Sequence, residues 1–172
     1  IRPSRGLGDV YKRQELGIRR IAYVDLDAHF CDGVASAFSE DPDVMLVSAH
    51  EANRWPFQGK LEENFPDKNL YAPISKGSTD IDLEALFEYI FYPAIENFKP
   101  EALIVQGGAD MLKDDPLSRL EMTNNCLWKV LSKLALLAPK LLLTSGGGYN
   151  PWSVSRLWTG FWAILNLSLI HI

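Results

Sequence analysis

The sequence predicts an α/β protein with a three-layer α/β/α architecture around a mainly parallel sheet. Apolar segments of strand length alternate along the chain with segments whose apolar residues recur at helical spacing. The strand segments are apolar throughout, which is typical of parallel strands that helices cover on both faces. The chain has 172 residues, of which 47% are hydrophobic, so it is long enough to bury one sizeable core.

The first half of the chain contributes three predicted strands and one short helix. In chain order these are a strand beginning at Ile21, a helix over 32–38, a strand over 44–49 and a strand over 70–74. Between the last two strands, residues 50–69 form a long polar stretch with three aromatic residues and no regular period. Because loops of this length in a compact domain are usually functional or disordered, we expect one of these two properties here.

The second half alternates helices and strands. Thr79 and Asp80 are suitable caps for a helix whose apolar residues recur at helical spacing, namely Leu83, Leu86, Phe87, Ile90, Phe91, Ala94, Ile95 and Phe98. Pro93 should kink that helix or end it early, because proline removes a helical hydrogen bond. The remaining elements are a strand over 102–106, a helix capped by Thr123 that extends to Leu137, a strand over 140–145 and a helix beginning near Pro151.

The end of the first strand carries charged residues. Asp25, Asp27 and His29 follow its apolar residues, and alternate residues of a strand share one face. Carboxylates at the end of a buried strand would be half-desolvated unless a cation lay among them. A single aspartate in this place usually caps the following loop, but Asp-x-His on one face favours a metal site.

Two further strand ends carry unusual residues. Gly107 and Gly108 precede Asp110 after one strand, and three glycines at 146–148 precede Tyr149 after another. In parallel sheets, ligands bind beyond the carboxyl ends of the strands, so all three strand ends should open on the same rim. Three glycines before a helix also suggest a phosphate-binding turn, but the G-x-G-x-x-G spacing and the P-loop lysine are missing from the sequence.

Composition narrows the class of protein. The formal net charge is −5 and no basic cluster exists, which argues against nucleic acid as a general partner. No apolar run reaches the roughly 20 residues that span a bilayer and no signal peptide is visible, so we expect no membrane association. Cys31 and Cys126 show neither metal-ligand spacing nor a disulfide framework, which favours a reducing, cytoplasmic setting. The sequence does not indicate an oligomeric state.

Both ends of the chain differ in character from the rest. Residues 1–14 lack helical or strand periodicity and resemble translated library-adapter sequence, and residues 167–172 have the same look. We therefore expect residues 15–166 to be the biological segment, cut at both ends, and the two flanks to be non-native.

Three motifs occur in an order and at a spacing that point to one family. They are Val24-Asp25-Leu26-Asp27-Ala28-His29 with Asp32-Gly33-Val34, then Gln106-Gly107-Gly108-Ala109-Asp110 with Asp115-Pro116, then Gly146-Gly147-Gly148-Tyr149-Asn150. Together they resemble the histone deacetylase superfamily, including bacterial acetoin-utilisation-type deacetylases and acetylpolyamine amidohydrolases. The resemblance covers residues 20–166 and implies an arginase/deacetylase-like fold, here incomplete, as the carboxyl-terminal half of the catalytic domain.

For the site, the resemblance implies that Asp27, His29 and Asp110 bind a catalytic zinc ion, with an open position left for water and substrate. Tyr149 matches the family's transition-state tyrosine, whose hydroxyl donates to the developing oxyanion of the substrate. Gly147 and Gly148 would contribute to substrate binding, because they let the backbone approach closely enough to place that tyrosine.

The resemblance also implies two further groups around the zinc. Asp25, Ser48 and the carbonyl of Ala49 match ligands of a structural potassium site. Trp55 falls where the family places an aromatic wall of the acyl-lysine tunnel, although simple loop packing explains an aromatic residue there equally well.

The sequence departs from the family pattern at positions that bear on activity. The family's general base is a pair of adjacent histidines, whereas these 172 residues contain only His29, His50 and His171. General-base help contributes about 10²–10⁴-fold in rate, so this chain alone should be a feeble catalyst. Related arginases hold a second metal with carboxylates where Cys31 and Gly108 stand here, so a dimanganese site is disfavoured.

The sequence therefore predicts a zinc-dependent deacetylase or amidohydrolase that acts on C–N bonds other than peptide bonds. The expected reaction is hydrolysis of an N-acetyl amide, either acetyl-lysine or an acetylpolyamine, to acetate and a free amine. The alternative is a non-catalytic metal-binding or interaction relative of the same fold, which kept the site and lost turnover.

Overall fold

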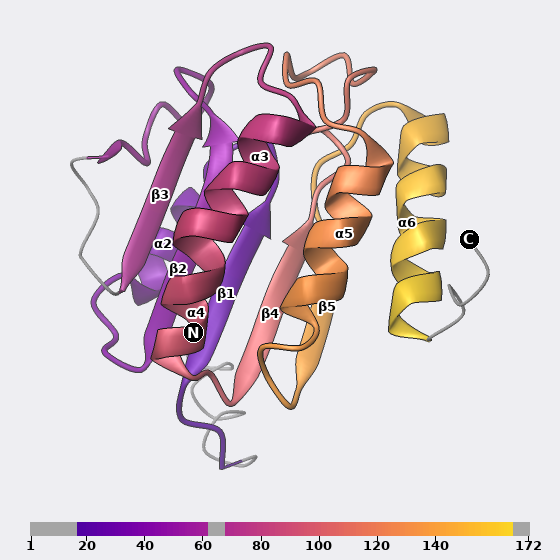
Figure 1. The fold of residues 1–172 in the computed structure, drawn as a ribbon. Helices are drawn as coiled ribbons and strands as arrows, with labels where there is room; N and C mark the ends of the chain where they lie inside the picture. The colour runs from indigo at the N-terminus through magenta and orange to yellow at the C-terminus, as the bar shows by residue number, and fades with distance from the viewer. Residues whose placement is uncertain (1–16, 62–67, 167–172) are drawn as a thin grey trace, which may run out of the picture.

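The structure is a computed structural model that describes residues 17–61 and 68–166 (Figure 1). The predicted flanks, 1–14 and 167–172, lie outside the described residues, as do residues 62–67 of the predicted loop. Within the described ranges, no helix is both long and apolar enough to cross a membrane.

Five parallel strands form one sheet in the order β3-β2-β1-β4-β5 (Figure 1). The strands are β1 (Ile21–Leu26), β2 (Val44–Glu51), β3 (Asn69–Ile74), β4 (Ala102–Gly107) and β5 (Leu141–Ser145). β1 is central and pairs with both β2 and β4, and its alternate residues Ala22, Val24 and Leu26 are completely buried. The predicted parallel sheet is confirmed, and its middle strand is the one that leads into Asp27 and His29.

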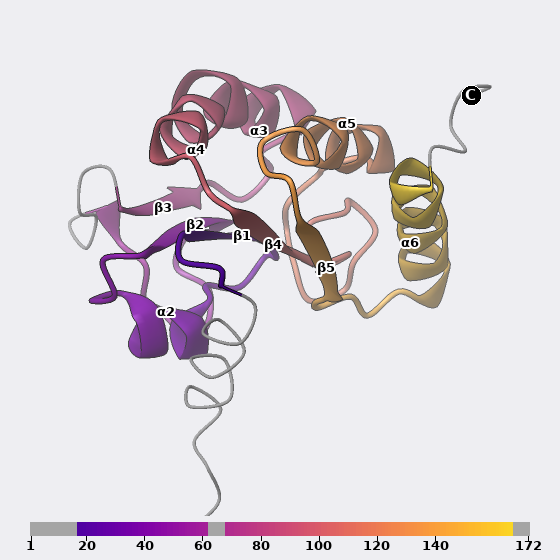
Figure 2. The same cartoon turned by 90° about the horizontal axis from the view of Figure 1, so that it is seen from below.

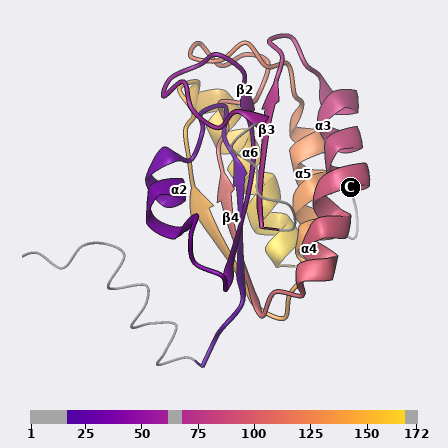
Figure 3. The same cartoon turned by 90° about the vertical axis from the view of Figure 1, so that its left-hand side faces the viewer.

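Helices flank the sheet on both sides, which confirms the three-layer architecture (Figures 2 and 3). α2 (Asp32–Phe38) lies on one side, and α3 (Asp80–Leu86), α4 (Tyr92–Phe98), α5 (Asn124–Leu134) and α6 (Pro151–Leu165) lie on the other. Among the described residues, no helix covers β4 and β5 on the α2 side, where Leu142 of β5 is exposed. Coverage of both faces, as predicted, is therefore complete on one side and partial on the other.

The two sides of the sheet bury separate apolar clusters. The larger cluster joins β1, β2 and β4 to α3, α4, α5 and α6, and it includes Phe161 of α6, which lies against Gly107 of β4. The smaller cluster lies beneath α2 and contains Phe30 and Tyr71, whose rings meet edge-on with centroids 4.8 Å apart. Both clusters continue past the carboxyl ends of the strands, where Ala28 and Ala109 of the larger one alternate with the charged residues.

The predicted helix around Pro93 continues through that proline. α3 and α4 are joined by a π-helical stretch, Phe87–Phe91, which ends just before Pro93. Proline lacks the amide hydrogen and crowds the carbonyl four residues earlier, so the helix widens locally instead of ending. Of the predicted apolar stripe, the residues at four-residue spacing are buried, namely Leu83, Phe87, Phe91 and Ile95, whereas Ile90 is 50% exposed.

Strand β2 is longer than the apolar pattern predicts. It extends to Glu51, because His50 and Glu51 pair with Pro73 and Ile74 of β3. Glu51 is buried in spite of its charge, and no apolar periodicity marks such a residue as part of a strand. The other predicted boundaries agree with the structure to within a few residues.

Candidate metal centre

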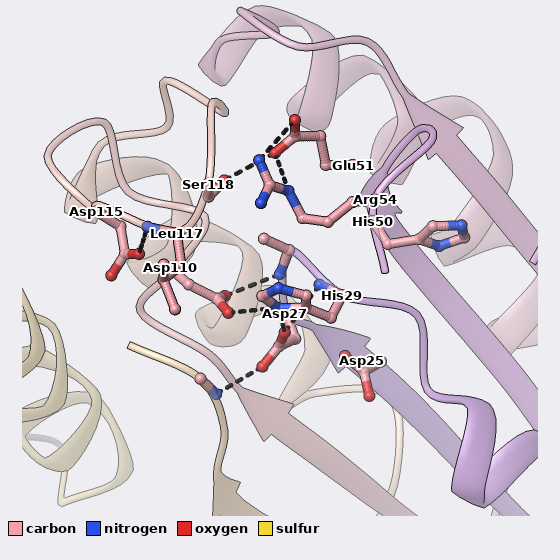
Figure 4. Close-up of polar contacts among 12 residues, drawn as sticks. Asp25, Asp27, His29, His50, Glu51, Arg54, Asp110, Asp115, Leu117 and Ser118 are labelled. Atoms are coloured by element: carbon pink, nitrogen blue, oxygen red, sulfur yellow. Dashed lines mark hydrogen bonds and ion pairs between the residues drawn. The ribbon is translucent and has the colours of Figure 1, made fainter. Parts of the chain in front are cut away.

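The carboxyl ends of β1 and β4 bring three potential metal ligands together (Figure 4). Asp27 and His29 follow β1, and Asp110 follows β4, its neighbour in the sheet. One ligand atom from each of these side chains lies within 4.8 Å of the others. The structure therefore places at one point the two carboxylates and the imidazole that the sequence singled out.

The His29 ring stands between the two carboxylates. Its Nδ1 lies 3.1 Å from Asp27 Oδ1 and 3.0 Å from Asp110 Oδ2. The backbone holds the carboxylates in turn, because the amide of His29 donates to Asp27 Oδ1 (2.9 Å) and the amide of Ala28 donates to Asp110 Oδ1 (2.8 Å). The segment after β1 thus fixes its own ligands and the one contributed by β4.

The segment after β5 reaches the same point through Gly147. Its amide donates to Asp27 Oδ2 at 2.6 Å, and the side-chain amide of Gln106 donates to the same oxygen at 3.0 Å. A side chain at position 147 would overlap the carboxylate of Asp110, so only glycine leaves this space open. Gly148 has φ +150°, a left-handed value that side chains disfavour, and a Cβ there would lie 2.9 Å from that of Ala109.

The electrostatics of the three ligands favour a positive charge between them. Hydrogen bonds to Asp110 and Asp27 raise the pKa of His29 to about 10 in spite of its partial burial. Burial raises the pKa of Asp110 to about 6, aided by the negative charge of Asp27. Burial alone would raise the pKa of Asp27 as well, but hydrogen bonds from His29 and Gly147 outweigh it and lower that pKa to about 2.

These residues fit the zinc ion that the family resemblance implies. Two carboxylates and one imidazole are donor groups that zinc takes in catalytic sites. They lie close enough to share one ion, and the missing side chain at Gly147 keeps the space beside them free. A cation would also replace the proton that His29 otherwise holds between the carboxylates.

The predicted potassium ligands lie beside this centre. Asp25 and Ser48 are register partners on β1 and β2, and Ala49 pairs with the next residue of β1. The Asp25 side chain is 2% exposed; its Oδ2 accepts from the hydroxyl of Tyr23 at 2.6 Å, and its Oδ1 has no hydrogen-bond partner among the described residues. Burial raises the pKa of Asp25 well above its usual range.

Tyr149 and Trp55 border the open side of the centre. Both line a cavity of about 560 Å³ together with Asp27 and His29. Tyr149 is 50% exposed, and its amide donates to Asp115 Oδ2 at 2.7 Å. Burial and the negative charge of Asp110 raise the pKa of the Tyr149 phenol, so it keeps its proton at neutral pH.

Several residues that shape the site were given no role by the sequence. Gln106 and Asp115 lay inside recognised motifs, but only the structure shows that they hold Asp27 and the backbone of Tyr149. Glu51 was placed in the long loop, although its spacing from Arg54 allows an ion pair at i, i+3. That spacing is the one signal by which the sequence reveals it.

His50 lies away from the three ligands. Its ring is buried against Phe30, with centroids 5.0 Å apart, and its Nδ1 lies 3.1 Å from Ser48 Oγ. These contacts give His50 a structural role in the packing beneath α2. The thiol of Cys31 is also buried, which raises its pKa and keeps it protonated, the form that metals bind poorly.

Comparison with known proteins gives a consistent family. Residues 8–165 match the family model described as "Histone deacetylase domain". The chain is 30% identical over 154 residues to "Histone deacetylase 10, chloroplastic" of Oryza sativa subsp. japonica, covering 84% of this chain and 35% of that protein. It is 32% identical over 148 residues to "Histone deacetylase 14, chloroplastic" of Arabidopsis thaliana, covering 81% and 35%.

Comparison of the fold with solved structures also finds a histone deacetylase. The solved structure of the histone deacetylase Clr3 superposes with a TM-score of 0.84 at 28% sequence identity, over 91% of this chain and 28% of that one. The chain spans about a third of the length of the two curated relatives described above.

Proposed function

We propose that this chain, which belongs to the histone deacetylase family, carries the metal centre of a zinc-dependent deacetylase. The reaction is hydrolysis of an N-acetyl amide, in acetyl-lysine or an acetylpolyamine, to acetate and a free amine. One observation carries the proposal: Asp27, His29 and Asp110 converge at one point, and two of them, Asp27 and His29, line the same cavity as the half-exposed Tyr149.

Asp27, His29 and Asp110 would hold the zinc ion. When bound, zinc supplies Lewis-acid polarisation of the acetamide carbonyl and lowers the pKa of a water molecule. Gly147 and Gln106 orient Asp27 by donating to its second oxygen, and Ala28 orients Asp110. Such outer contacts keep ligands in place and raise metal affinity.

The phenol of Tyr149 would donate a hydrogen bond to the substrate oxygen as negative charge develops there. Its raised pKa keeps the proton available at neutral pH. Asp115 accepts from the Tyr149 amide, and the left-handed conformation of Gly148 turns the chain just before this residue. A preorganised donor of this kind contributes to catalysis because it needs no reorganisation during the reaction.

The potassium site is a second part of the proposal. The carboxylate of Asp25, the hydroxyl of Ser48 and the carbonyl of Ala49 would hold a monovalent cation beside the zinc. The partner-free Oδ1 of Asp25, buried among the described residues, supports this assignment because an unpaired buried carboxylate oxygen is costly.

Turnover by this chain alone should be slow. Adjacent histidines do not occur in its sequence, and general-base help is worth about 10²–10⁴-fold. The second candidate function is a metal-binding relative of the family that does not hydrolyse amides. The cytoplasmic setting stays a prediction from the cysteine pattern.

Zinc binding and acetate release, measured together, test the proposal. Equilibrium dialysis of the purified chain should give one zinc ion per chain. The complete product of its gene should release acetate from an acetyl-lysine peptide or an acetylpolyamine in a zinc-dependent manner, and the preferred amine would identify the substrate class. Bound zinc with no acetate release from the complete product would favour the non-catalytic relative, and no zinc binding would contradict both.

A further inference from the structure

Glu51 is a buried charge at the end of β2 that does not contact the three metal ligands with its side chain. It is 6% exposed, and its carboxylate accepts four hydrogen bonds. Figure 4 shows Glu51 with Arg54 and Ser118. Two of the hydrogen bonds come from Arg54, through Nε at 2.6 Å and Nη2 at 3.0 Å. The others come from the amide of Arg119 at 2.9 Å and the hydroxyl of Ser118 at 3.3 Å.

These contacts join two loops that are far apart in the sequence. Arg54 lies in the segment after β2, next to Trp55, and Ser118 lies in the segment between β4 and α5. Ser118 and Glu51 are separated by 67 positions in the chain. A guanidinium that pairs with a carboxylate through two nitrogens fixes orientation as well as distance. Arg54 therefore holds the Glu51 carboxylate in the position where it accepts from Ser118 and Arg119 of the other loop.

The loop after β2 forms one wall of the cavity, and the loop after β4 supports the backbone of the other wall, Tyr149. The loop after β2 presents Trp55, which is 64% exposed and lines the cavity. In the loop after β4, Asp115 accepts from the amides of Leu117 at 2.9 Å and Tyr149 at 2.7 Å. Residues 115–119 therefore connect Glu51 to the proposed catalytic tyrosine: Ser118 and Arg119 donate to Glu51, and Asp115 accepts from the amide of Tyr149.

The backbone of Glu51 is tied to the metal centre separately from its side chain. Its amide donates to the carbonyl of Ala28 at 2.9 Å, and the amide of Ala28 donates to Asp110 Oδ1. A substitution of the Glu51 side chain leaves these backbone bonds in place. Such a substitution should therefore disturb the two loops while sparing the ligands.

We propose that Glu51, paired with Arg54, is a positioning residue that sets the separation of the Trp55 and Tyr149 walls and thereby the affinity for the acylated substrate. The inference rests on the proposed deacetylase function for its substrate and on the hydrogen bonds of Glu51 for its mechanism. Neither residue touches the reacting atoms, so their effect is on substrate placement.

The first test uses the chain itself and needs no catalysis. Glu51→Gln keeps the shape of the side chain but removes its charge, and Glu121→Gln is a matched control, because Glu121 forms an exposed ion pair with Lys113 at 3.2 Å. Hydrogen exchange measured by mass spectrometry should become at least about tenfold faster in peptides covering 52–58 and 115–121 of Glu51→Gln. β1, α6 and the control should be unchanged, and zinc affinity should stay within about threefold.

Unchanged exchange in both loops would overturn the proposal. If Glu51→Gln does not fold, Ser118→Ala replaces it. This variant removes the longest of the four hydrogen bonds to Glu51, together with the bond that Ser118 Oγ accepts from the amide of Leu120 at 3.1 Å, and it should loosen the same two loops to a smaller degree. Equal loosening of the whole molecule would also contradict a positioning role.

The second test uses the complete product of the gene and separates positioning from simple destabilisation. Glu51→Gln should raise KM for an acetyl-lysine peptide about tenfold and change kcat by less than about threefold. Glu51→Asp, which restores the charge, should reverse part of this rise in KM. A fall in kcat with KM unchanged would refute the assignment. If wild type releases no acetate, the proposed function fails, while the exchange result still decides whether Glu51 joins the loops.

Discussion

Two buried acidic clusters lie at the same rim of the sheet and differ in how their charge is balanced. In one, Glu51 is paired with the guanidinium of Arg54, so its pKa is held below the usual value although burial alone would raise it. In the other, the imidazole of His29 is the one charged partner of Asp27 and Asp110 among the described residues, and its pKa rises to about 10. Their remaining partners are uncharged backbone and side-chain amides.

This difference separates a carboxylate whose charge is neutralised by its own chain from a pair of carboxylates whose charge favours a bound cation. Glu51 receives a permanent positive charge from Arg54 and two further donors, the hydroxyl of Ser118 and the amide of Arg119, and such a group ties loops together. The ligand cluster has two carboxylates and no arginine or lysine in contact among the described residues. A cluster of this second kind stabilises whichever cation enters it, and its residue types suit zinc.

The largest effect should come from breaking the cluster of Asp27, His29 and Asp110, the unbalanced cluster, in which two carboxylates share one imidazole. Asp110→Ala leaves two ligands, which cannot fix the ion, so zinc affinity should fall by more than about 100-fold, beyond the range of outer-shell changes. Zinc titration monitored by equilibrium dialysis measures this change. Asp114→Ala, four residues along the same loop and exposed, is the matched control and should bind zinc normally. Unchanged affinity in Asp110→Ala would remove this residue from the ligand set.

Tyr149→Phe should separate metal binding from chemistry. The phenol lies at the edge of the cavity and outside the three-ligand group, so zinc affinity should not change. Loss of one oxyanion donor costs about 10²–10³-fold in kcat, and that decrease is expected in the complete product of the gene. Steady-state kinetics with an acetylated peptide measure it; turnover equal to wild type would exclude Tyr149 from the mechanism.

Gln106→Leu should have an intermediate effect on the same cluster. It removes the hydrogen bond to Asp27 Oδ2 but leaves the one from Gly147. Zinc affinity should fall by about 10-fold, the lower end of the range for outer contacts. A competition titration with a chelator is sensitive enough to detect this, and a change below about twofold would show that Gly147 alone orients Asp27.

Glu51→Gln should have the smallest effect on zinc affinity, within about threefold, together with an effect on stability that depends on pH. Glu51 has a lowered pKa in the folded state, so its ionised form contributes stability above its ordinary value of 4.5, and this is lost as pH falls through the folded-state pKa. At pH 7 the variant should lose about 1–3 kcal/mol in the free energy of unfolding. Urea unfolding at several pH values measures the difference, which should shrink below pH about 4.5. A difference that grows on acidification would contradict the ion-pair account.

The sequence predicted the unbalanced cluster better than it predicted the contacts of Glu51 with Arg54 and Ser118. Asp27, His29 and Asp110 directly follow apolar strands, and the rule that parallel strands end at one rim brings them together without knowledge of side-chain contacts. Glu51 and Ser118 meet only through the tertiary fold, across 67 positions, and no local pattern encodes that contact.

The fold shows the same division between local and long-range information. The apolar runs of β1, β2 and β4 mark buried strands, and the sequence predicted them within a few residues. The helix around Pro93 was predicted with a kink or an early end, whereas its packing against the sheet keeps it continuous through a π-helical stretch. Tertiary packing decided this outcome, since proline alone disfavours a helix.

The most direct test of the metal centre is calorimetric titration of the chain with zinc at pH 7, repeated in buffers of different ionisation enthalpy. If Asp27, His29 and Asp110 hold the ion, one zinc should bind per chain and displace about one proton, because His29 has a pKa of about 10 and is protonated at pH 7 without metal. Absence of zinc binding, or binding that releases no proton and persists in Asp110→Ala, would contradict the account.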